Sequence, residues 1–274
     1  MFLPKDGAIM SSISSLHQYM SFAAETAYLA GRLTLGYFGT GVLPDFKADD
    51  SPVTVADRLA EQLIRGRIEQ AYPDHAIVGE EFGVTESGGA SAARTSHRWF
   101  IDPIDGTKSF MRGVPLYGVL LGLEIDGRVE VGAAYYPGTD ELLTAATGEG
   151  CWWNGRRARV SPATDLSRAY VSTTDLGGFI ALGRAAEWER IARRAYVRVG
   201  WSDAYGYLLV ATGRIEIMLD PAMHPWDAGP FPPIFREAGG YYGDWQGNET
   251  IYGNEGLATT QALLPEVLAL IRGD

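Results

Sequence analysis

The sequence predicts a mixed α+β and α/β fold in two parts. Up to residue 147, apolar residues recur with helical spacing in two segments and then fall into short runs separated by turn residues, which indicates helices followed by a largely antiparallel sheet. After residue 148, strand-like runs and helix-like segments alternate, which is typical of an α/β arrangement. We therefore expect residues 1–147 to form one part of the molecule and residues 148–274 the other.

Two helices are expected near the N-terminus. Over residues 13–37, apolar side chains recur every three or four positions. A second apolar face covers residues 56–71, and Tyr72-Pro73 ends it because the residue before a proline disfavours helical backbone. Residues 1–12 lack the apolar run of a signal peptide, so they are either a loose extension or precede a start at Met10.

Short apolar runs predict the strands of both parts. In the first part, strands are expected at residues 76–78, 98–101, 117–125 and 128–136, with a hairpin turn at Asp126-Gly127. The segment from Gly83 to His97 is rich in small and polar residues without periodicity, which predicts a mobile loop between two strands. In the second part we expect strands at residues 169–173, 196–199 and 215–219, and helices at residues 181–195, 203–212, 226–237 and 264–271.

The composition argues against several classes of partner. The chain has 34 acidic and 23 basic side chains and a net charge of -11, whereas nucleic acids and anionic membranes reward clusters of Lys and Arg. No stretch is apolar over the roughly 18 residues that a membrane span needs. A single cysteine, Cys151, cannot form an internal disulfide, and no Cys/His spacing suggests zinc. We therefore expect a soluble protein of the reducing cytoplasm.

The densest chemical signal is the segment DPIDGT, which follows an apolar strand directly. Its carboxylates, Asp102 and Asp105, can converge on one point where the chain turns, and the proline between them fixes part of that turn. Gly106 and Thr107 lie where a helix could begin, so their free backbone N–H groups suit a phosphate. Carboxylates beside a phosphate site favour magnesium, although a lone Asp-Pro or Asp-Gly pair more often only makes a turn.

Two further acidic segments lie at predicted element boundaries, where loops commonly carry functional groups. Gly79-Glu80-Glu81 follows the first predicted strand, and residues 225–228, PWDA, precede a helix that ends at Gly239-Gly240. Three separated acidic motifs are far less expected by chance than one. Gly229-Pro230 follows PWDA at once, and we expect it to disturb the start of that helix.

These three segments, in their order and spacing, resemble the signature motifs of the inositol monophosphatase superfamily, and the resemblance covers most of the chain from Lys47 onward. It implies the layered α/β/α/β/α sandwich of the inositol monophosphatase and fructose-1,6-bisphosphatase-like fold, with the active site between the two halves. It also implies a homodimer, a small phosphate monoester as substrate, and two or three Mg²⁺ ions per active site.

The resemblance implies ligand sets for two of these magnesium ions. Glu80, Asp102 and the Ile104 carbonyl would hold the first ion. Asp102, Asp105 and Asp227 would hold the second. Two metal ions arranged in this way clamp a phosphate for in-line attack by water, so that no covalent intermediate with the protein is needed.

The resemblance also assigns residues to the water and the phosphate. Thr107 together with Glu80 would orient and activate the attacking water, while the N–H groups of Gly106 and Thr107 would receive the phosphate. Asp57 would support the site through Thr107 or through a water. Without the resemblance, Asp57 would be interpreted as a charge at a helix N-terminus, worth about 0.3–1 kcal/mol. Glu81 has no direct role in the family and is interpreted as a structural neighbour.

Three stretches resemble the histidinol-phosphatase subfamily in particular, namely residues 105–110 with 113–115, residues 203–214 and residues 218–221. We expect Asp105, Asp203 and Asp220 to contact the substrate, because the ammonium and imidazole groups of histidinol phosphate could pair with carboxylates. The same carboxylates could accept hydrogen bonds from inositol hydroxyls. The residues alone therefore leave both esters open. The resemblance of the three stretches to the histidinol-phosphatase subfamily favours histidinol phosphate.

Two rival interpretations are disfavoured. A sugar bisphosphatase or nucleotide phosphatase of the same superfamily needs a basic cluster for a second phosphate. The basic runs at residues 156–159 and 190–198 are interpreted instead as solvated faces or dimer contacts. A regulatory protein that keeps the fold without catalysis would lack one of the metal ligands. The chain has all of the residues expected at the metal and water site, namely Glu80, Asp102, Asp105, Thr107 and Asp227.

Overall fold

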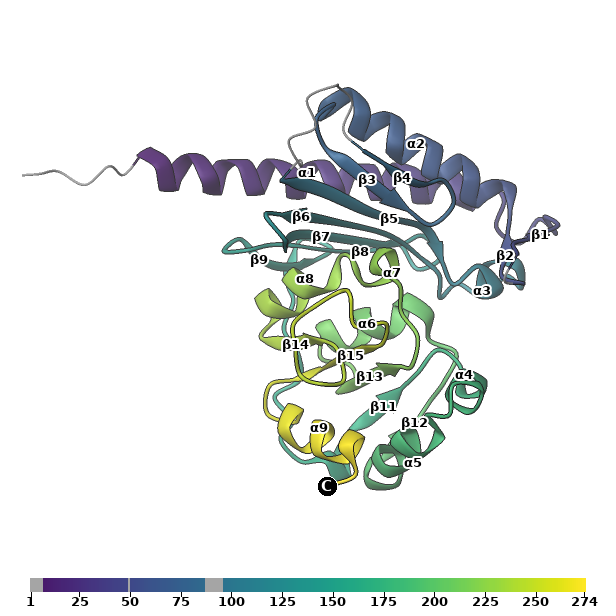
Figure 1. Ribbon diagram of the computed structural model, residues 1–274, viewed down its shortest axis with the longest axis vertical. Coiled ribbons are helices and arrows are strands. Elements are labelled where there is room, and N and C mark those ends of the chain that lie inside the picture. Colours follow the sequence, from purple (N-terminus) through teal and green to yellow (C-terminus); the bar gives the residue numbers. More distant parts are fainter. Residues whose placement is uncertain (1–6, 49, 87–95) are drawn as a thin grey trace, which may run out of the picture.

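The computed structural model describes residues 7–48, 50–86 and 96–274, with residues 7–14 described by their backbone alone. The elements form five layers, as the resemblance implies (Figure 1). Two sheets alternate with three layers of helices. The layer at the top of the figure holds α1 (Gly7–Leu35) and α2 (Val55–Ala71), and the layer between the sheets holds α6 (Asp203–Ala211) and α8 (Phe231–Ala238). The third layer holds α4 (Leu176–Ala181), α5 (Ala185–Arg194) and α9 (Leu264–Arg272).

The first sheet has eight strands in the order β10-β9-β8-β7-β6-β5-β3-β4. Every neighbouring pair is antiparallel except β3 and β5, which confirms the prediction of a largely antiparallel sheet. Asp126 and Gly127 form the tight turn between β6 and β7, both with positive φ, as a two-residue hairpin requires. The strands are β3 (Ala76–Gly79), β4 (Gly83–Thr85), β5 (His97–Asp105), β6 (Gly118–Ile125), β7 (Arg128–Tyr136), β8 (Glu141–Ala146), β9 (Gly150–Trp153) and β10 (Arg156–Arg157).

The second sheet has five strands in the order β12-β11-β13-β15-β14, and it is mixed. β11 runs parallel to both of its neighbours, while β15 runs antiparallel to β13 and β14. Its strands are β11 (Tyr170–Ser172), β12 (Val197–Arg198), β13 (Ile217–Asp220), β14 (Gly240–Gly243) and β15 (Gly256–Thr260). The remaining elements are short: β1 (Asp45–Phe46) pairs with β2 (Pro52–Val53), and the other three are α3 (Thr107–Met111), the 3₁₀ turn η1 (Leu166–Arg168) and α7 (Pro225–Ala228).

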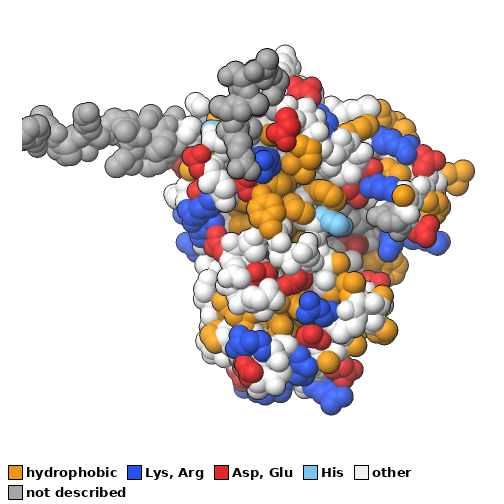
Figure 2. All heavy atoms as spheres, in the orientation of Figure 1, with side chains coloured by type: hydrophobic (Ala, Val, Ile, Leu, Met, Phe, Trp, Pro, Cys, Tyr) orange, Lys and Arg blue, Asp and Glu red, His pale blue; other side chains and the backbone are white. Residues whose placement is uncertain are grey.

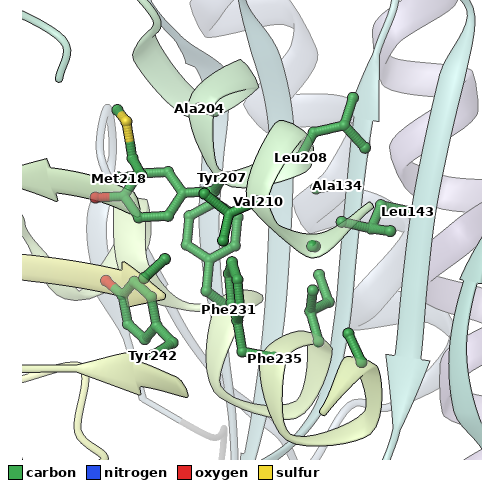
Figure 3. Close-up of a cluster of buried hydrophobic side chains, with 14 of the residues drawn as sticks. Ala134, Leu143, Ala204, Tyr207, Leu208, Val210, Met218, Phe231, Phe235 and Tyr242 are labelled. Carbon is green, nitrogen blue, oxygen red and sulfur yellow. The ribbon is translucent and has the colours of Figure 1, made fainter. Parts of the chain in front are cut away.

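Each interface between layers has its own apolar core. Small residues of α1, such as Ala23 and Ala27, are fully buried against α2 and the first sheet, so the helices lie close to the strands. The central core lies between the two sheets, where stacked aromatic rings of α6 and α8 fill the space (Figure 3). In the ranges that the structure describes, no helix combines the length and apolarity needed to cross a membrane.

Several sequence-based predictions of elements were wrong in detail. The predicted helix at residues 181–195 corresponds to α5, which begins four residues later, while α4, which ends just before Gly183 with its φ of 70°, was not predicted. In the segment predicted as a loop from Gly83 to His97, residues 83–85 form β4 and His97 begins β5, while residues 87–95 lie outside the described ranges. α1 begins at Gly7, inside the predicted extension. The eight-stranded sheet continues to residue 157, so the division at 147/148, which stays a prediction, does not coincide with the end of that sheet.

The predicted helix at residues 226–237 is broken into α7 and α8 at Gly229-Pro230, and packing explains the break. The backbone there lies directly on two glycines of the first sheet. A Cβ atom added to Gly122 would lie 2.3 Å from the Gly229 carbonyl oxygen, and one added to Gly132 would lie 2.1 Å from the Pro230 carbonyl oxygen. These contacts hold the end of α7 against β5 and β6.

We expect Gly132→Ala to lower the free energy of unfolding by about 1–3 kcal/mol, because backbone atoms cannot yield to the added methyl group as a side chain could. Gly66→Ala is the matched control. Gly66 is exposed within α2 with no atom near an added Cβ, so this change should stabilise the protein by about 0.5–1 kcal/mol. Urea unfolding of both variants measures the effect, and an unchanged midpoint for Gly132→Ala would contradict the packing account.

Candidate active site

Two parallel strands of the first sheet bring the acidic motifs together. Glu80 follows β3, and its backbone N–H donates to the Ile101 carbonyl of β5 at 3.2 Å. The pairing register of β5 shifts between Asp102 and Asp105, so the chain bulges where the two carboxylates leave the strand. Asp227 arrives from α7, which contacts the same strand. The carboxylates therefore meet at the carboxyl end of β3 and β5.

These side chains line a cavity of about 440 Å³ beside the end of β5, the start of α3 and α7. Figure 2 shows acidic side chains in the hollow on this face. Every residue predicted to bind metal or phosphate lines the cavity. Three further lining residues, Ser51, His224 and Trp226, had not been assigned to the site from the sequence. The full set is Lys47, Ser51, Glu80, Asp102, Ile104, Asp105, Gly106, Thr107, His224, Trp226 and Asp227.

Burial and mutual repulsion dominate the electrostatics of the cavity. Burial, together with the charge of neighbouring carboxylates, raises the pKa values of Asp102 and Asp105 well above their ordinary range. Burial raises the pKa of Asp227 to about 7, although the His224 N–H donates to this carboxylate at 2.8 Å. A hard divalent cation is the partner that such a group of oxygen ligands fits.

Among the residues that the structure describes, no group of three or more Asp, Glu, His and Cys side chains is arranged to hold a metal ion. The oxygen chemistry and the mutual repulsion of the carboxylates nevertheless fit a cation.

Lys47 supplies positive charge at one edge of the cavity. Its Nζ lies 2.8 Å from a carboxylate oxygen of both Glu80 and Glu81. Although burial lowers the pKa of Lys47, the hydrogen bonds to these two carboxylates raise it above its ordinary value. Glu81 thus contacts Lys47, as a structural neighbour of Glu80.

Asp57 is tied to the proposed water-activating residue Thr107. The Thr54 N–H and hydroxyl both donate to one Asp57 oxygen, at 2.8 and 2.5 Å, which closes the first turn of α2. The Thr107 hydroxyl lies 3.2 Å from the other Asp57 oxygen and 3.1 Å from the Ile104 carbonyl oxygen. Asp57 therefore contacts Thr107 directly. It is also the acidic residue in the first turn of α2, as the alternative interpretation expects, while its part in the site stays a prediction.

Gly106 makes the turn that presents backbone N–H groups to the cavity. Its φ of 93° lies in the left-handed region, which glycine adopts without strain, and α3 begins at the next residue. The first N–H groups of a helix have no partner within the helix. The expected phosphate cradle at Gly106 and Thr107 is therefore consistent with the local backbone.

Asp203 and Asp220 lie beside the main cavity. They line a second cavity of about 190 Å³ together with Asp105 and Asp227, which belong to both. Asp220 is buried and accepts hydrogen bonds from the Thr174 N–H at 2.9 Å and from the Tyr207 hydroxyl at 2.9 Å. Burial raises the pKa of Asp203 to about 6. The predicted substrate-contacting carboxylates thus adjoin the predicted metal ligands.

Sequence reasoning missed the ion pair that holds the Glu80 loop. Glu61 is completely buried in α2, and its carboxylate accepts hydrogen bonds from the N–H groups of Glu81 at 2.8 Å and Phe82 at 3.2 Å. Arg65 donates to Glu61 at 2.7 Å and also to the Gly83 carbonyl. Glu61 and Arg65 are four residues apart, a spacing common in surface pairs of helices, so the sequence carried no sign of their burial.

The comparisons with known proteins agree with this geometry. The family model described as "Inositol monophosphatase family" matches residues 15–272, so the chain belongs to the inositol monophosphatase family, a family of metal-dependent phosphatases. The chain is 42% identical to a histidinol-phosphatase of Chlorobaculum parvum, over 88% of this chain and 91% of that protein. It is 33% identical to a histidinol-phosphatase of Mycobacterium tuberculosis, over 92% and 97%.

Other relatives carry different names. The chain is 32% identical to the Nus factor SuhB of Escherichia coli, over 87% of this chain and 90% of that protein. Among solved structures, the extragenic suppressor protein suhB of Bartonella henselae superposes with a TM-score of 0.83 at 26% identity, covering 93% of this chain and 98% of that one. The family and its phosphatase chemistry follow from these comparisons, while the ester is a separate question.

We expect Glu61→Gln to loosen the Glu80 loop. The change keeps the size of the side chain but removes the charge that Arg65 and two backbone N–H groups contact, which should lower the free energy of unfolding by about 1.5–3 kcal/mol. Hydrogen exchange of the Glu81 and Phe82 amides should accelerate. Glu69→Gln, at an exposed position of the same helix, is the control, and equal exchange in the two variants would refute the anchoring role.

Proposed function

We propose that this phosphatase hydrolyses L-histidinol phosphate to L-histidinol and inorganic phosphate, with magnesium as its cofactor. The observation that carries the proposal is the acidic lining of the second cavity, which includes Asp105, Asp203 and Asp220 and, among the residues that the structure describes, no Lys or Arg. A phosphate bound at Gly106 and Thr107 would place the organic part of the ester among these carboxylates. Carboxylates favour a cationic group there and disfavour a second phosphate.

The carboxylates of Glu80, Asp102, Asp105 and Asp227, with the Ile104 carbonyl, would hold two or three Mg²⁺ ions. When bound, magnesium would lower the pKa of a water and neutralise charge on the phosphate. The donor chemistry supports this assignment, since every proposed ligand is a hard oxygen.

The chain's own residues would orient the reactants. The Thr107 hydroxyl, held by Asp57, can accept a hydrogen bond from the attacking water, and Glu80 can take its proton. The N–H groups of Gly106 and Thr107 would donate to the phosphate oxygens. As the oxygen of water bonds to phosphorus, the bond from phosphorus to the ester oxygen breaks, and that oxygen leaves as the alcohol of histidinol after taking a proton.

A homodimer in the cytoplasm, with parts at residues 1–147 and 148–274, completes the proposal. The single cysteine, Cys151, is buried without a disulfide, which is consistent with a reducing compartment.

An inositol 1-phosphate phosphatase is the second candidate. It is favoured by the presence of Asp203 and Asp220 in the second cavity, because carboxylates accept hydrogen bonds from inositol hydroxyls as well as from an ammonium group. The family description fits this alternative, while the relative named Nus factor SuhB fits the weaker possibility of a regulatory protein that keeps the fold.

Phosphate release from a panel of esters distinguishes these candidates. With L-histidinol phosphate, inositol 1-phosphate, fructose 1,6-bisphosphate and adenosine 3′,5′-bisphosphate, we expect kcat/KM to be highest for L-histidinol phosphate by at least about tenfold, equivalent to roughly 1.4 kcal/mol. A preference for inositol 1-phosphate would replace the proposed substrate. No turnover of any ester with magnesium present would favour the regulatory role.

Metal dependence is tested separately. We expect activity to disappear after chelation and to return with Mg²⁺, because the buried carboxylates need a cation before they can receive a phosphate. Ca²⁺ should inhibit, since its larger and looser coordination misplaces the water and the leaving group. Full turnover in chelator would refute the magnesium assignment.

A further inference from the structure

A chain of two hydrogen bonds ends on Asp203. The indole Nε1–H of Trp201 donates to the Ser109 hydroxyl oxygen at 2.7 Å. The Ser109 hydroxyl in turn donates to Oδ2 of Asp203. Ser109 is completely buried in α3, two residues after Thr107, and Asp203 begins α6. The two bonds therefore join the helix of the predicted phosphate cradle to the carboxylate beside it.

The backbone around Asp203 adopts conformations that side chains rarely take. Trp201 has a φ of 62° and Asp203 a φ of 43°, both in the left-handed region. For a bulky residue such as tryptophan this is a genuine outlier, and such conformations persist only where surrounding contacts hold them. The Trp201 N–H donates to the Thr174 carbonyl at 3.0 Å, and the hydroxyls of Ser172 and Ser202 are hydrogen-bonded to each other. The turn is thus held from both sides.

The held carboxylate faces the place where the organic part of an ester would lie. A Cβ atom added to Gly106 would lie 3.0 Å from the Asp203 side chain, so Asp203 contacts the phosphate-cradle turn. Asp203 lines the 190 Å³ cavity and also a larger cavity of about 870 Å³, which Trp201 lines as well. Trp201 as a residue is 54% exposed, even though the one polar atom of its side chain is bonded inward.

We propose that Ser109 and Trp201 are positioning residues that fix the Asp203 carboxylate and thereby set the preference for a phosphate ester whose organic part carries a protonated amine. The inference rests on the proposed function and extends it to two residues that do not bind phosphate or metal. The Ser109 hydroxyl donates to Oδ2, and no other part of the chain that the structure describes donates a hydrogen bond to Oδ1 of Asp203, so Oδ1 can accept one from the substrate. Without Ser109, the carboxylate loses the contact that fixes its rotamer.

The test compares Ser109→Ala and Trp201→Phe with the wild-type, magnesium-loaded enzyme on L-histidinol phosphate and p-nitrophenyl phosphate, which has no amine. For Ser109→Ala we expect KM for L-histidinol phosphate to rise about tenfold while kcat changes less than about twofold, because a charge-assisted contact is lost from binding and not from the chemical step. The ratio of kcat/KM between the two esters should fall about tenfold. Trp201→Phe should lower the ratio about threefold, and its exposed position makes a folding defect avoidable.

A matched control is Ser167→Ala. Ser167 also donates its hydroxyl to an aspartate, Asp165 at 2.7 Å, but in an exposed turn away from the cavities. This variant should keep the wild-type ratio of kcat/KM. The same ratio in Ser109→Ala and in the control would overturn the proposal.

Equal losses on both esters would also overturn it, since they would mean that Ser109 and Trp201 only support the fold or the metal site. The test remains separate from that of the proposed function. If the wild-type enzyme prefers another ester of the panel, the proposed substrate fails. The ratio is then taken between that ester and p-nitrophenyl phosphate, and a selective fall in it would support positioning by Ser109 while refuting the preference for an amine.

Discussion

Repulsion among buried carboxylates is the constraint on which the rest of this structure depends. Asp102, Asp105 and Asp227 meet at the end of two strands, where burial and neighbouring charge favour their neutral forms. The protein stabilises these groups largely with dipoles. The Ile104 N–H donates to Asp102 at 2.9 Å and the His224 N–H to Asp227, so a backbone dipole contacts each of these two carboxylates. Without a cation, the ionised carboxylates repel one another and lower the stability of the fold, whereas a bound cation would relieve this repulsion.

The architecture around the cluster fixes each segment that carries a carboxylate. The Glu61 carboxylate accepts a hydrogen bond from the N–H of Glu81 and so holds the loop that carries Glu80. The Thr54 N–H donates to Asp57 at the start of α2. Glycines of β6 and β7 let the chain after Asp227 lie directly on the sheet, so α7 ends there and α8 starts anew. Glu61 and the glycines act on the backbone of these segments, whereas Thr54 contacts the Asp57 carboxylate itself. Together these contacts hold the segments that carry the acidic side chains.

The features that sequence predicted are those set by local pattern. The apolar periodicity of α2 and the alternation and turn of the β6-β7 hairpin carry their own signal, and DPIDGT indicates a site because two carboxylates lie within one short motif. Features that depend on distant partners were missed. β4 has exposed residues and no apolar pattern, and the Arg65 side chain holds its Gly83 and Thr85 in place. The disturbance at Gly229-Pro230 was expected from the sequence, but the packing that goes with it was not, because Gly122 and Gly132 lie about a hundred positions earlier.

Thermal unfolding of Asp105→Asn in chelator at pH 8 tests the central claim most directly. Burial and neighbouring carboxylates raise the folded-state pKa of Asp105, so the stability present below its unfolded pKa is lost as pH rises through the raised value. At pH 8 the variant, with its neutral amide, should therefore unfold at a higher temperature than wild type, by about 2–4 °C for each kcal/mol of repulsion relieved. Added Mg²⁺ should raise the unfolding temperature of wild type more than that of the variant. A variant that is less stable than wild type in chelator, with equal gains from Mg²⁺, would contradict the account.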